Sequence, residues 1–301
     1  MQVTIVPASP KTGLATIRAL LSDPSQPALQ VKGYYRDLNR VPAELTTNPR
    51  FQAVQGDVED AATLDFSGSV AVFNITPPLY EEKEVVPHAR LVSENVKATI
   101  AKAGSVKRLV LLSSVGAQYD QGTGEILSNN AAESILKDAA PEVVFVRCGF
   151  FMENWATSIE TVREAGFMFT TITPVDMSLP MIAVKDIGST CAAEVLAVGT
   201  PLPAVPHIFE LHGPRTYNSL DAQKAFEAAA GKPVELRPVE KDGLAGFYAA
   251  VFPPMVAQAF TEMNTSYLEG GIIYNDPQPT EGEVKLGKTE LVEAVKEMYG
   301  A

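Results

Sequence analysis

The turn after the first apolar run carries the side chains best suited to holding an anion. It spans residues 7–13 and directly follows Val3–Val6. In a glycine-rich dinucleotide turn, glycines allow a tight bend and let backbone N–H groups approach a pyrophosphate. Only the last motif glycine is present, and Pro10 removes one N–H donor, so the alternative is a loop that no longer binds a dinucleotide tightly. If a pyrophosphate is bound, we expect its ligands to be the remaining N–H groups with Ser9, Lys11, Thr12 and Gly13.

A second group of charged residues follows the next apolar run, at Arg36 and Asp37. This is where the adenosine ribose lies in a dinucleotide-binding fold. An arginine there can bind the 2′-phosphate of NADP, whereas an acidic residue can accept a hydrogen bond from the 2′-hydroxyl of NAD. The pair favours NADP, and a merely solvated Arg36 is the alternative.

Polar residues also end three later apolar runs. They are Asp57, Asn74 with Thr76, and Ser113 with Ser114. Ligands of open parallel sheets bind outside the carboxyl ends of the strands. We expect Asp57 to accept a hydrogen bond from an adenine amino group, Asn74 and Thr76 to line the ribose side, and Ser113 and Ser114 to face a nicotinamide.

The elements that would position these residues alternate between short β-branched runs and helix-period segments. This alternation predicts an α/β fold with a doubly wound parallel sheet, Rossmann-like in type. The predicted helices are 13–21, 86–103 and 130–137, and the predicted strands are 3–6, 30–35, 51–54, 70–75, 108–112 and 143–147. Prolines then punctuate a less regular second half. We expect a nucleotide-binding domain over residues 1–150 and a smaller, more irregular substrate region over 151–301, interleaved with the first.

Composition narrows the possible partners and the compartment. A net charge of −12 argues against nucleic acid or an anionic membrane as partner. No apolar stretch is long enough to span a membrane, and no leader precedes the first strand. Cys148 and Cys191 sit in apolar contexts and are interpreted as buried thiols, which fits a reducing compartment. We therefore expect a cytoplasmic protein, and the three separated histidines predict no metal site.

Several segments together resemble the NmrA-like branch of the short-chain dehydrogenase/reductase superfamily. They are residues 36–37, 56–60, 72–76, 106–114 and 146–155, with 179–188 and 209–217 resembling quinone-reductase-like members. The resemblance implies a Rossmann fold and NADP binding. It also implies one of two roles: reduction of small molecules, including fungal natural-product tailoring in secondary metabolism, or redox sensing without turnover.

The chain departs at the catalytic acid from the superfamily that it resembles. The usual Tyr-x-x-x-Lys pair is absent, Tyr119 lies too close to Ser114 to replace it, and Asn130 stands where relatives place lysine or histidine. Asparagine orients groups but supplies no net proton at neutral pH. We therefore predict a site centred on Ser114 and Asn130, without a tyrosine acid, beside a pocket walled by Phe150, Phe151, Asn154 and Trp155.

Three functions follow from these observations. The first is an NADP(H)-dependent oxidoreductase acting on a hydrophobic small molecule, in a monomer or homodimer. The second is a nucleotide-sensing regulator without turnover. The third is a cofactor-independent lyase, isomerase or cyclase, which the prolines at 7 and 10 support.

Overall fold

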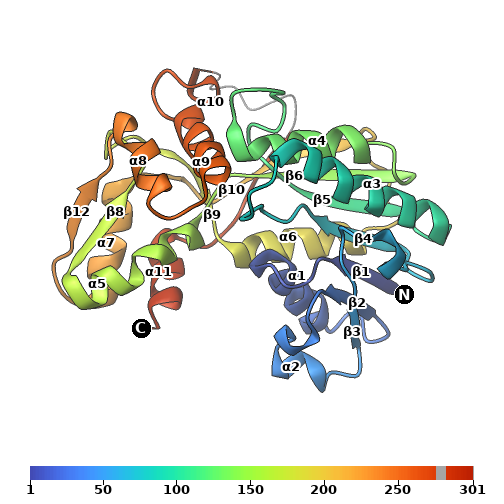
Figure 1. Ribbon diagram of the computed structural model, residues 1–301. Helices are drawn as coiled ribbons and strands as arrows, with labels where there is room; N and C mark the ends of the chain where they lie inside the picture. The colour runs from blue at the N-terminus through green and yellow to red at the C-terminus, as the bar shows by residue number, and fades with distance from the viewer. Residues whose placement is uncertain (276–282, 301) are drawn as a thin grey trace.

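An eight-stranded, fully parallel sheet forms the centre of the computed structural model, which describes residues 1–275 and 283–300 (Figure 1). The strand order is β3-β2-β1-β4-β5-β6-β10-β13. The strands are β1 (Gln2–Val6), β2 (Gln30–Tyr35), β3 (Phe51–Gln55), β4 (Ala71–Ile75), β5 (Arg108–Ser114), β6 (Glu142–Cys148), β10 (His207–His212) and β13 (Glu283–Leu286). The strand order reverses direction at β1 and β4, as in a doubly wound sheet, so the predicted fold class is confirmed.

Helices cover both faces of this sheet. Helices α1 (Lys11–Ser22) and α6 (Val184–Leu196) lie on one face, and α3 (Val85–Ala103) and α4 (Leu127–Leu136) lie on the other (Figure 1). Each helix buries an apolar stripe, such as Ile17 and Leu20 of α1 or Val92 and Val96 of α3. The two stripes form the two main core clusters, one on each side of the sheet.

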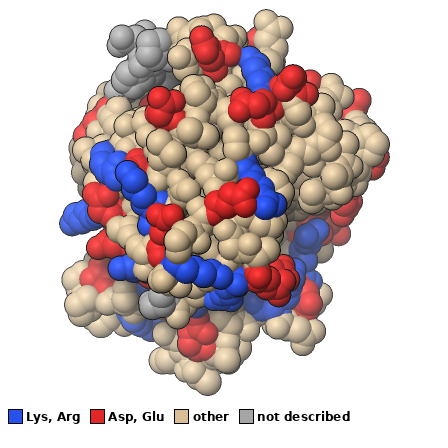
Figure 2. All heavy atoms as spheres, turned by 90° about the vertical axis from the view of Figure 1, so that its left-hand side faces the viewer, with Lys and Arg blue, Asp and Glu red and all other residues tan. Residues whose placement is uncertain are grey.

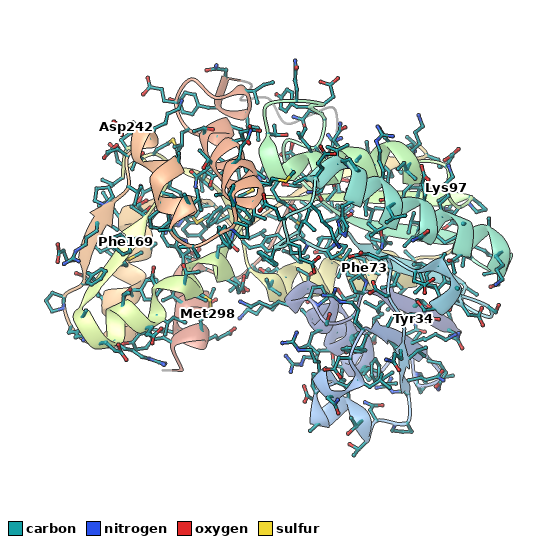
Figure 3. All side chains as sticks on the ribbon, viewed as in Figure 1. Tyr34, Phe73, Lys97, Phe169, Asp242 and Met298 are labelled. Carbon is teal, nitrogen blue, oxygen red and sulfur yellow. The ribbon has the colours of Figure 1, made fainter. Side chains whose placement is uncertain are left out.

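The sheet strands are apolar on both faces because helices cover both faces. Every residue of β4 is buried, and Phe73 at its centre lies inside the molecule, whereas Lys97 points outward from α3 (Figure 3). The six predicted strands all form, with ends that differ by at most two residues. Cys148 and Cys191 are free and buried, as expected.

The second half of the chain contributes both to the sheet and to a separate layer (Figure 1). That layer contains two small sheets, β7 (Phe150–Phe151), β9 (Leu179–Ile182) and β11 (Thr216–Tyr217) in one and β8 (Phe167–Thr170) and β12 (Glu235–Pro238) in the other. Its helices are α5 (Ile159–Ala165), α7 (Ser219–Ala230), α8 (Leu244–Ala249), α9 (Pro254–Tyr267), α10 (Ile272–Asn275) and α11 (Leu291–Tyr299). Acidic and basic side chains are interspersed over the face of this layer that Figure 2 shows.

Shorter helices complete the described chain. These are α2 (Ala43–Thr46) and the 3-10 turns η1 (Leu38–Arg40), η2 (Ala61–Thr63), η3 (Gly124–Ile126), η4 (Met152–Ser158) and η5 (Lys241–Gly243). Among the described residues no helix is long and apolar enough to cross a membrane. Because α6, β10 and β13 come from beyond residue 150, the second half is built into the sheet as well as set beside it, and a division at residue 150 stays a prediction.

Candidate active site

A large cavity opens at the carboxyl ends of the parallel strands. Its volume is about 1060 Å³, and both halves of the chain line it. The sheet side contributes the ends of β4, β5 and β6, while β7, η4 and α9 supply the opposite wall. The predicted convergence of strand ends at one crevice is therefore present in the structure.

The first helix points its N-terminus into this cavity. Pro10 is the N-cap of α1, and Lys11 and Thr12 line the cavity. The N–H groups of a helix's first turn have no intrahelical acceptor, so those of residues 11–13 are available to an anion. A Cβ at Gly13 would lie 2.9 Å from the carbonyl oxygen of Ala8, which explains why this motif glycine is needed for the close turn.

A second, smaller pocket lies beside the first turn of α1, at the end of β2. It has a volume of about 240 Å³ and is lined by Ser9, Tyr35, Arg36, Asp37 and Arg40. Ser9 and Arg36 were predicted from the sequence, whereas Arg40 was not. Arg40 is the last residue of η1 and lines the pocket. The Asp37 carboxylate accepts the Asn39 N–H at 2.9 Å and caps that turn, which gives this acid a structural role.

Two residues that line these pockets carry a buried hydroxyl group with no hydrogen-bond partner within the described part of the chain. They are Tyr35 at the small pocket and Thr76 at the large one. Burial raises the pKa of Tyr35 to about 12, so its hydroxyl stays protonated and can donate. Buried polar groups are normally satisfied, so these two hydroxyls are exceptions within the described part of the chain.

The serines at the end of β5 are held differently from each other. The Ser113 hydroxyl donates to Glu133 Oε1 at 2.6 Å, and Arg147 binds the same carboxylate through Nε at 2.9 Å and Nη2 at 2.6 Å. Ser114 Oγ donates to the Val115 carbonyl at 3.0 Å. Both serines line the cavity, as predicted, and a buried ion pair fixes the first.

Two residues that the sequence analysis assigned to the nucleotide do not line either pocket. Asn74 is buried and donates from Nδ2 to the Val6 carbonyl at 3.0 Å, which ties β4 to β1. Asp57 accepts the Glu59 N–H at 3.0 Å and closes a local turn. In this structure both side chains form hydrogen bonds to the backbone near the ends of strands.

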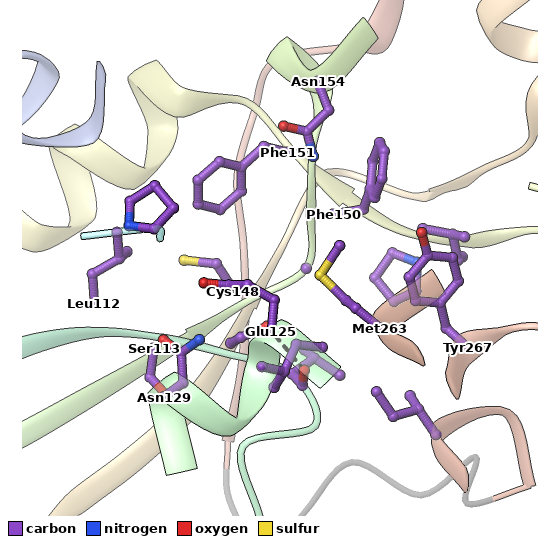
Figure 4. Close-up of a pocket in the computed structure, with 18 of the residues that line it drawn as sticks. Leu112, Ser113, Glu125, Asn129, Cys148, Phe150, Phe151, Asn154, Met263 and Tyr267 are labelled. Atoms are coloured by element: carbon purple, nitrogen blue, oxygen red, sulfur yellow. Dashed lines mark hydrogen bonds between the residues drawn. The ribbon is translucent and has the colours of Figure 1, made fainter. Parts of the chain in front are cut away.

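The catalytic asparagine predicted from the sequence also lies outside the cavity. Helix α4 begins at Leu127, so Asn130 is inside the helix, where it donates to the Ala117 carbonyl at 2.9 Å. Its neighbour Asn129 lines the cavity instead (Figure 4). The prediction failed because it placed the start of the helix three residues too late.

The wall opposite the sheet is largely apolar. Phe150, Phe151 and Asn154 line it as predicted (Figure 4). Trp155 packs instead in the core of the second half, with its indole N–H unpaired among the described residues. Helix α9 adds Met263 and Tyr267, which the sequence analysis did not assign to a site.

Other cavity residues that can take part in acid–base chemistry were not predicted from the sequence. Glu125 lines the cavity from η3, and Glu210 lines it together with His212, whose Nε2 lies 2.9 Å from Glu210 Oε2. No strand pattern marked Glu125, because it lies in an irregular segment between β5 and α4. Within the described residues no group of three His, Cys, Asp or Glu side chains is placed to hold a metal ion.

Comparison with known proteins decides the family. The model of the NAD(P)H-binding family matches residues 8–193, which is more than half of the chain. The chain belongs to this family. The match begins at the turn before α1 and ends within α6, so it covers the residues that line the small pocket and those that β4, β5 and β6 contribute to the large cavity.

Two curated relatives are each 26% identical to this chain over the aligned residues. One is an NAD(P)H azoreductase from Xenophilus azovorans, aligned over 216 residues that make up 70% of this chain and 66% of the relative. The other is a (4-alkanoyl-5-oxo-2,5-dihydrofuran-3-yl)methyl phosphate reductase from Streptomyces griseus, aligned over 76% of this chain and 77% of the relative. The prediction of an NAD(P)H-binding, oxidoreductase-like protein is confirmed at this level, whereas the NmrA-like branch stays a prediction.

Solved structures share the fold over the whole chain. A triphenylmethane reductase from Citrobacter sp. superposes with a TM-score of 0.70 at 16% identity, covering all of both chains. An NADPH-dependent quinone oxidoreductase from Escherichia coli superposes with a TM-score of 0.68 at 19% identity, covering 99% of this chain and all of that one. At these identities the likeness concerns the fold.

The residues present fit a nicotinamide dinucleotide. The N-terminus of α1 offers N–H groups beside Lys11, and the small pocket offers Arg36 and Arg40. The loss of two motif glycines therefore leaves the anion-binding elements in place.

Proposed function

We propose that this protein is an NADPH-dependent reductase of hydrophobic, aromatic small molecules. The observation that carries the proposal is the small pocket at the end of β2, where Arg36 and Arg40 converge beside Ser9. Two guanidinium groups at the ribose end of the site favour a nucleotide with a 2′-phosphate.

The residues of this chain would divide the work of binding. The first turn of α1 with Lys11 would bind the pyrophosphate, and Arg36 with Arg40 the 2′-phosphate. Thr76, which lines the cavity beyond the end of β4, would lie along the nucleotide. NADPH, when bound, supplies a hydride. Ser113 and Ser114 would orient the reacting groups, with Ser113 held by the buried Glu133.

The opposite wall suits a flat, apolar substrate. Tyr80 and Phe260 line the cavity and stack with Phe252 at centroid distances of 6.2 Å and 4.9 Å. Aromatic rings of a ligand pack well against such a surface. The names of the relatives, an azoreductase and a furanone phosphate reductase, support reduction of a conjugated acceptor. A place in secondary metabolism, which the resemblance implied, stays a prediction.

Calorimetric titration of NADPH and NADH tests the cofactor assignment. A charge-assisted hydrogen bond contributes about 1.5–3 kcal/mol, and Arg36 is exposed, so we expect Arg36→Ala and Arg40→Ala each to weaken NADPH binding by roughly tenfold at the lower end. NADH binding should change little. Arg18→Ala is the matched control, because Arg18 is exposed on α1 and paired with Glu44. Equal affinity for both nucleotides in the unmutated protein would refute the assignment.

Oxidation of NADPH by azo and quinone acceptors tests the activity. A reductase shows an acceptor-dependent loss of NADPH absorbance. A nucleotide-sensing regulator binds NADPH without that loss, and this outcome would replace our proposal. Membership of the NAD(P)H-binding family is evidence against the cofactor-independent alternative.

A further inference from the structure

Glu125 is an acidic residue that lines the cavity and takes no part in the binding roles proposed above. It lies at the middle of η3, between β5 and α4, and its side chain is partly buried and lines the cavity. Figure 4 shows it among Asn129, Cys148 and Met263, with Phe150 and Phe151 beyond. Its exposed surface therefore faces the space that a substrate would occupy.

The position of η3 is fixed by close packing against α9. Gly124 has a φ of +56°, which favours glycine, and a Cβ there would collide with the backbone of α9 at Ala259. Any side chain at position 124 would push η3 away from α9. The glycine thus sets the depth at which the next residue, Glu125, enters the cavity.

The carboxylate has no counter-charge among the described residues. Its hydrogen bond comes from the Ser128 hydroxyl at 3.3 Å, and no Lys, Arg or His forms an ion pair with it in the described part of the chain. The titratable groups around η3 are Tyr80 after β4, Tyr119 and Asp120 before η3, Glu133 on α4, Cys148 at the end of β6, Glu262 and Tyr267 on α9, and Tyr274 on α10. None of these groups is a cation.

This environment disfavours the ionised form of the group. Burial raises the pKa of Glu125 to about 7, and the hydrogen bond from Ser128 acts in the opposite direction. A carboxylic acid in such a site is substantially protonated near neutral pH.

We propose that Glu125 is the proton donor of this reductase, in place of the Tyr-x-x-x-Lys pair that the chain lacks. The inference rests on the proposed function and names its substrate class: planar aromatic acceptors with a C=O, C=N or N=N bond. The acceptor takes a hydride at one atom of this bond, with a nicotinamide dinucleotide as the reductant that is oxidised. The carboxyl proton of Glu125 moves to the other atom, and the carboxylate then regains a proton from water.

Titration of stability in the unliganded protein tests the acid without any turnover. A group whose pKa is raised in the folded state contributes stability that is lost as the pH rises from its unfolded value of 4.5 through about 7. Over this range the urea midpoint of the wild type should fall relative to that of Glu125→Gln, which does not titrate. Carboxyl infrared absorption should show one acid titrating near pH 7 that Glu125→Gln lacks.

Kinetics then separate proton donation from other roles. We expect Glu125→Gln to lower kcat on the order of 10²-fold with little change in KM or in NADPH affinity, and to remove the decline of kcat above about pH 7. Glu125→Asp keeps the acid and should retain part of the activity. Glu262→Gln is the matched control, because it removes a carboxylate from α9 beside η3 and should leave kcat and its pH profile unchanged.

Each outcome bears on a separate conclusion. A raised KM with unchanged kcat in Glu125→Gln would show that the carboxylate binds a cationic substrate, and would overturn the proposal. An unchanged pH profile, or no acid titrating near 7 in the wild type, would also overturn it. Failure of the wild type to bind NADPH would refute the proposed function, and the stability titration would still report on Glu125.

Discussion

Removing the Glu133 carboxylate should destabilise the protein more than removing an exposed acid. The carboxylate accepts two hydrogen bonds from Arg147 and one from Ser113. The two charged side chains are only 9% and 6% exposed. In Glu133→Ala the guanidinium would therefore stay buried without a counter-charge, which is the costly way to break a buried pair.

The expected loss follows from this burial. Breaking a buried ion pair on one side costs about 3–5 kcal/mol, whereas an exposed pair contributes about 0–1 kcal/mol. For a chain of this size each kcal/mol lowers the melting temperature by roughly 2 °C, so Glu133→Ala should melt about 6–10 °C lower. Urea unfolding followed by circular dichroism measures the free energy directly.

Two further variants make this result interpretable. Glu44→Ala removes an acid that is 53% exposed and paired with Arg18, and should cost less than about 1 kcal/mol. Glu133→Leu with Arg147→Met removes both buried charges and should be more stable than Glu133→Ala. A loss below about 1 kcal/mol in Glu133→Ala, or a double variant less stable than the single one, would refute the reasoning.

Three further predictions concern the nucleotide and substrate sites. A Cβ at Gly188 would lie 2.6 Å from the Cβ of Ala15, so Gly188→Leu should force α6 from α1 and lower both melting temperature and NADPH affinity; an unchanged melting curve would contradict this. Pro10→Gly restores an N–H at the N-cap of α1 and should raise NADPH affinity by calorimetry, and a fall would show that the proline does not limit binding. Asn129→Ala should lower the turnover of an azo or quinone acceptor by about tenfold, which corresponds to the loss of one hydrogen bond. Asn130→Ala should mainly lower the free energy of unfolding, because it removes the bond to the Ala117 carbonyl. A larger loss of turnover in Asn130→Ala than in Asn129→Ala would contradict the site.

The strands were predictable because burial on both faces requires a nearly continuous run of apolar residues, which is visible in a single sequence. The run Ala71–Ile75 is apolar at four of its five positions, and all five are buried. Arg36 was also predictable, since the end of the second strand is a fixed place in this fold. Arg40 was not, because its approach depends on a 3-10 turn capped by Asp37.

The choice between neighbouring asparagines shows how a small error in a helix boundary changes a site. Successive residues on a helix point about 100° apart, so the start of α4 decides whether residue 129 or 130 faces the cavity. The turn η3 moves that start to Leu127. Glu125 depends on the same turn and on its packing against α9, a contact between segments more than 100 residues apart in sequence that periodicity does not record.

The return of the chain to the main sheet at β10 and β13 determines how this protein can be recombined with a relative. Strand β10 pairs with β6 along its length, from His207 opposite Val144 to Leu211 opposite Cys148. A chimera joined once at residue 150 would therefore set a foreign strand against the native β6 and a foreign α6 against the native α1. A graft of new substrate specificity should instead exchange residues 150–182, 213–275 and 291–300 as three separate inserts, because α11 packs against α7, and keep α6, β10 and β13 with the host.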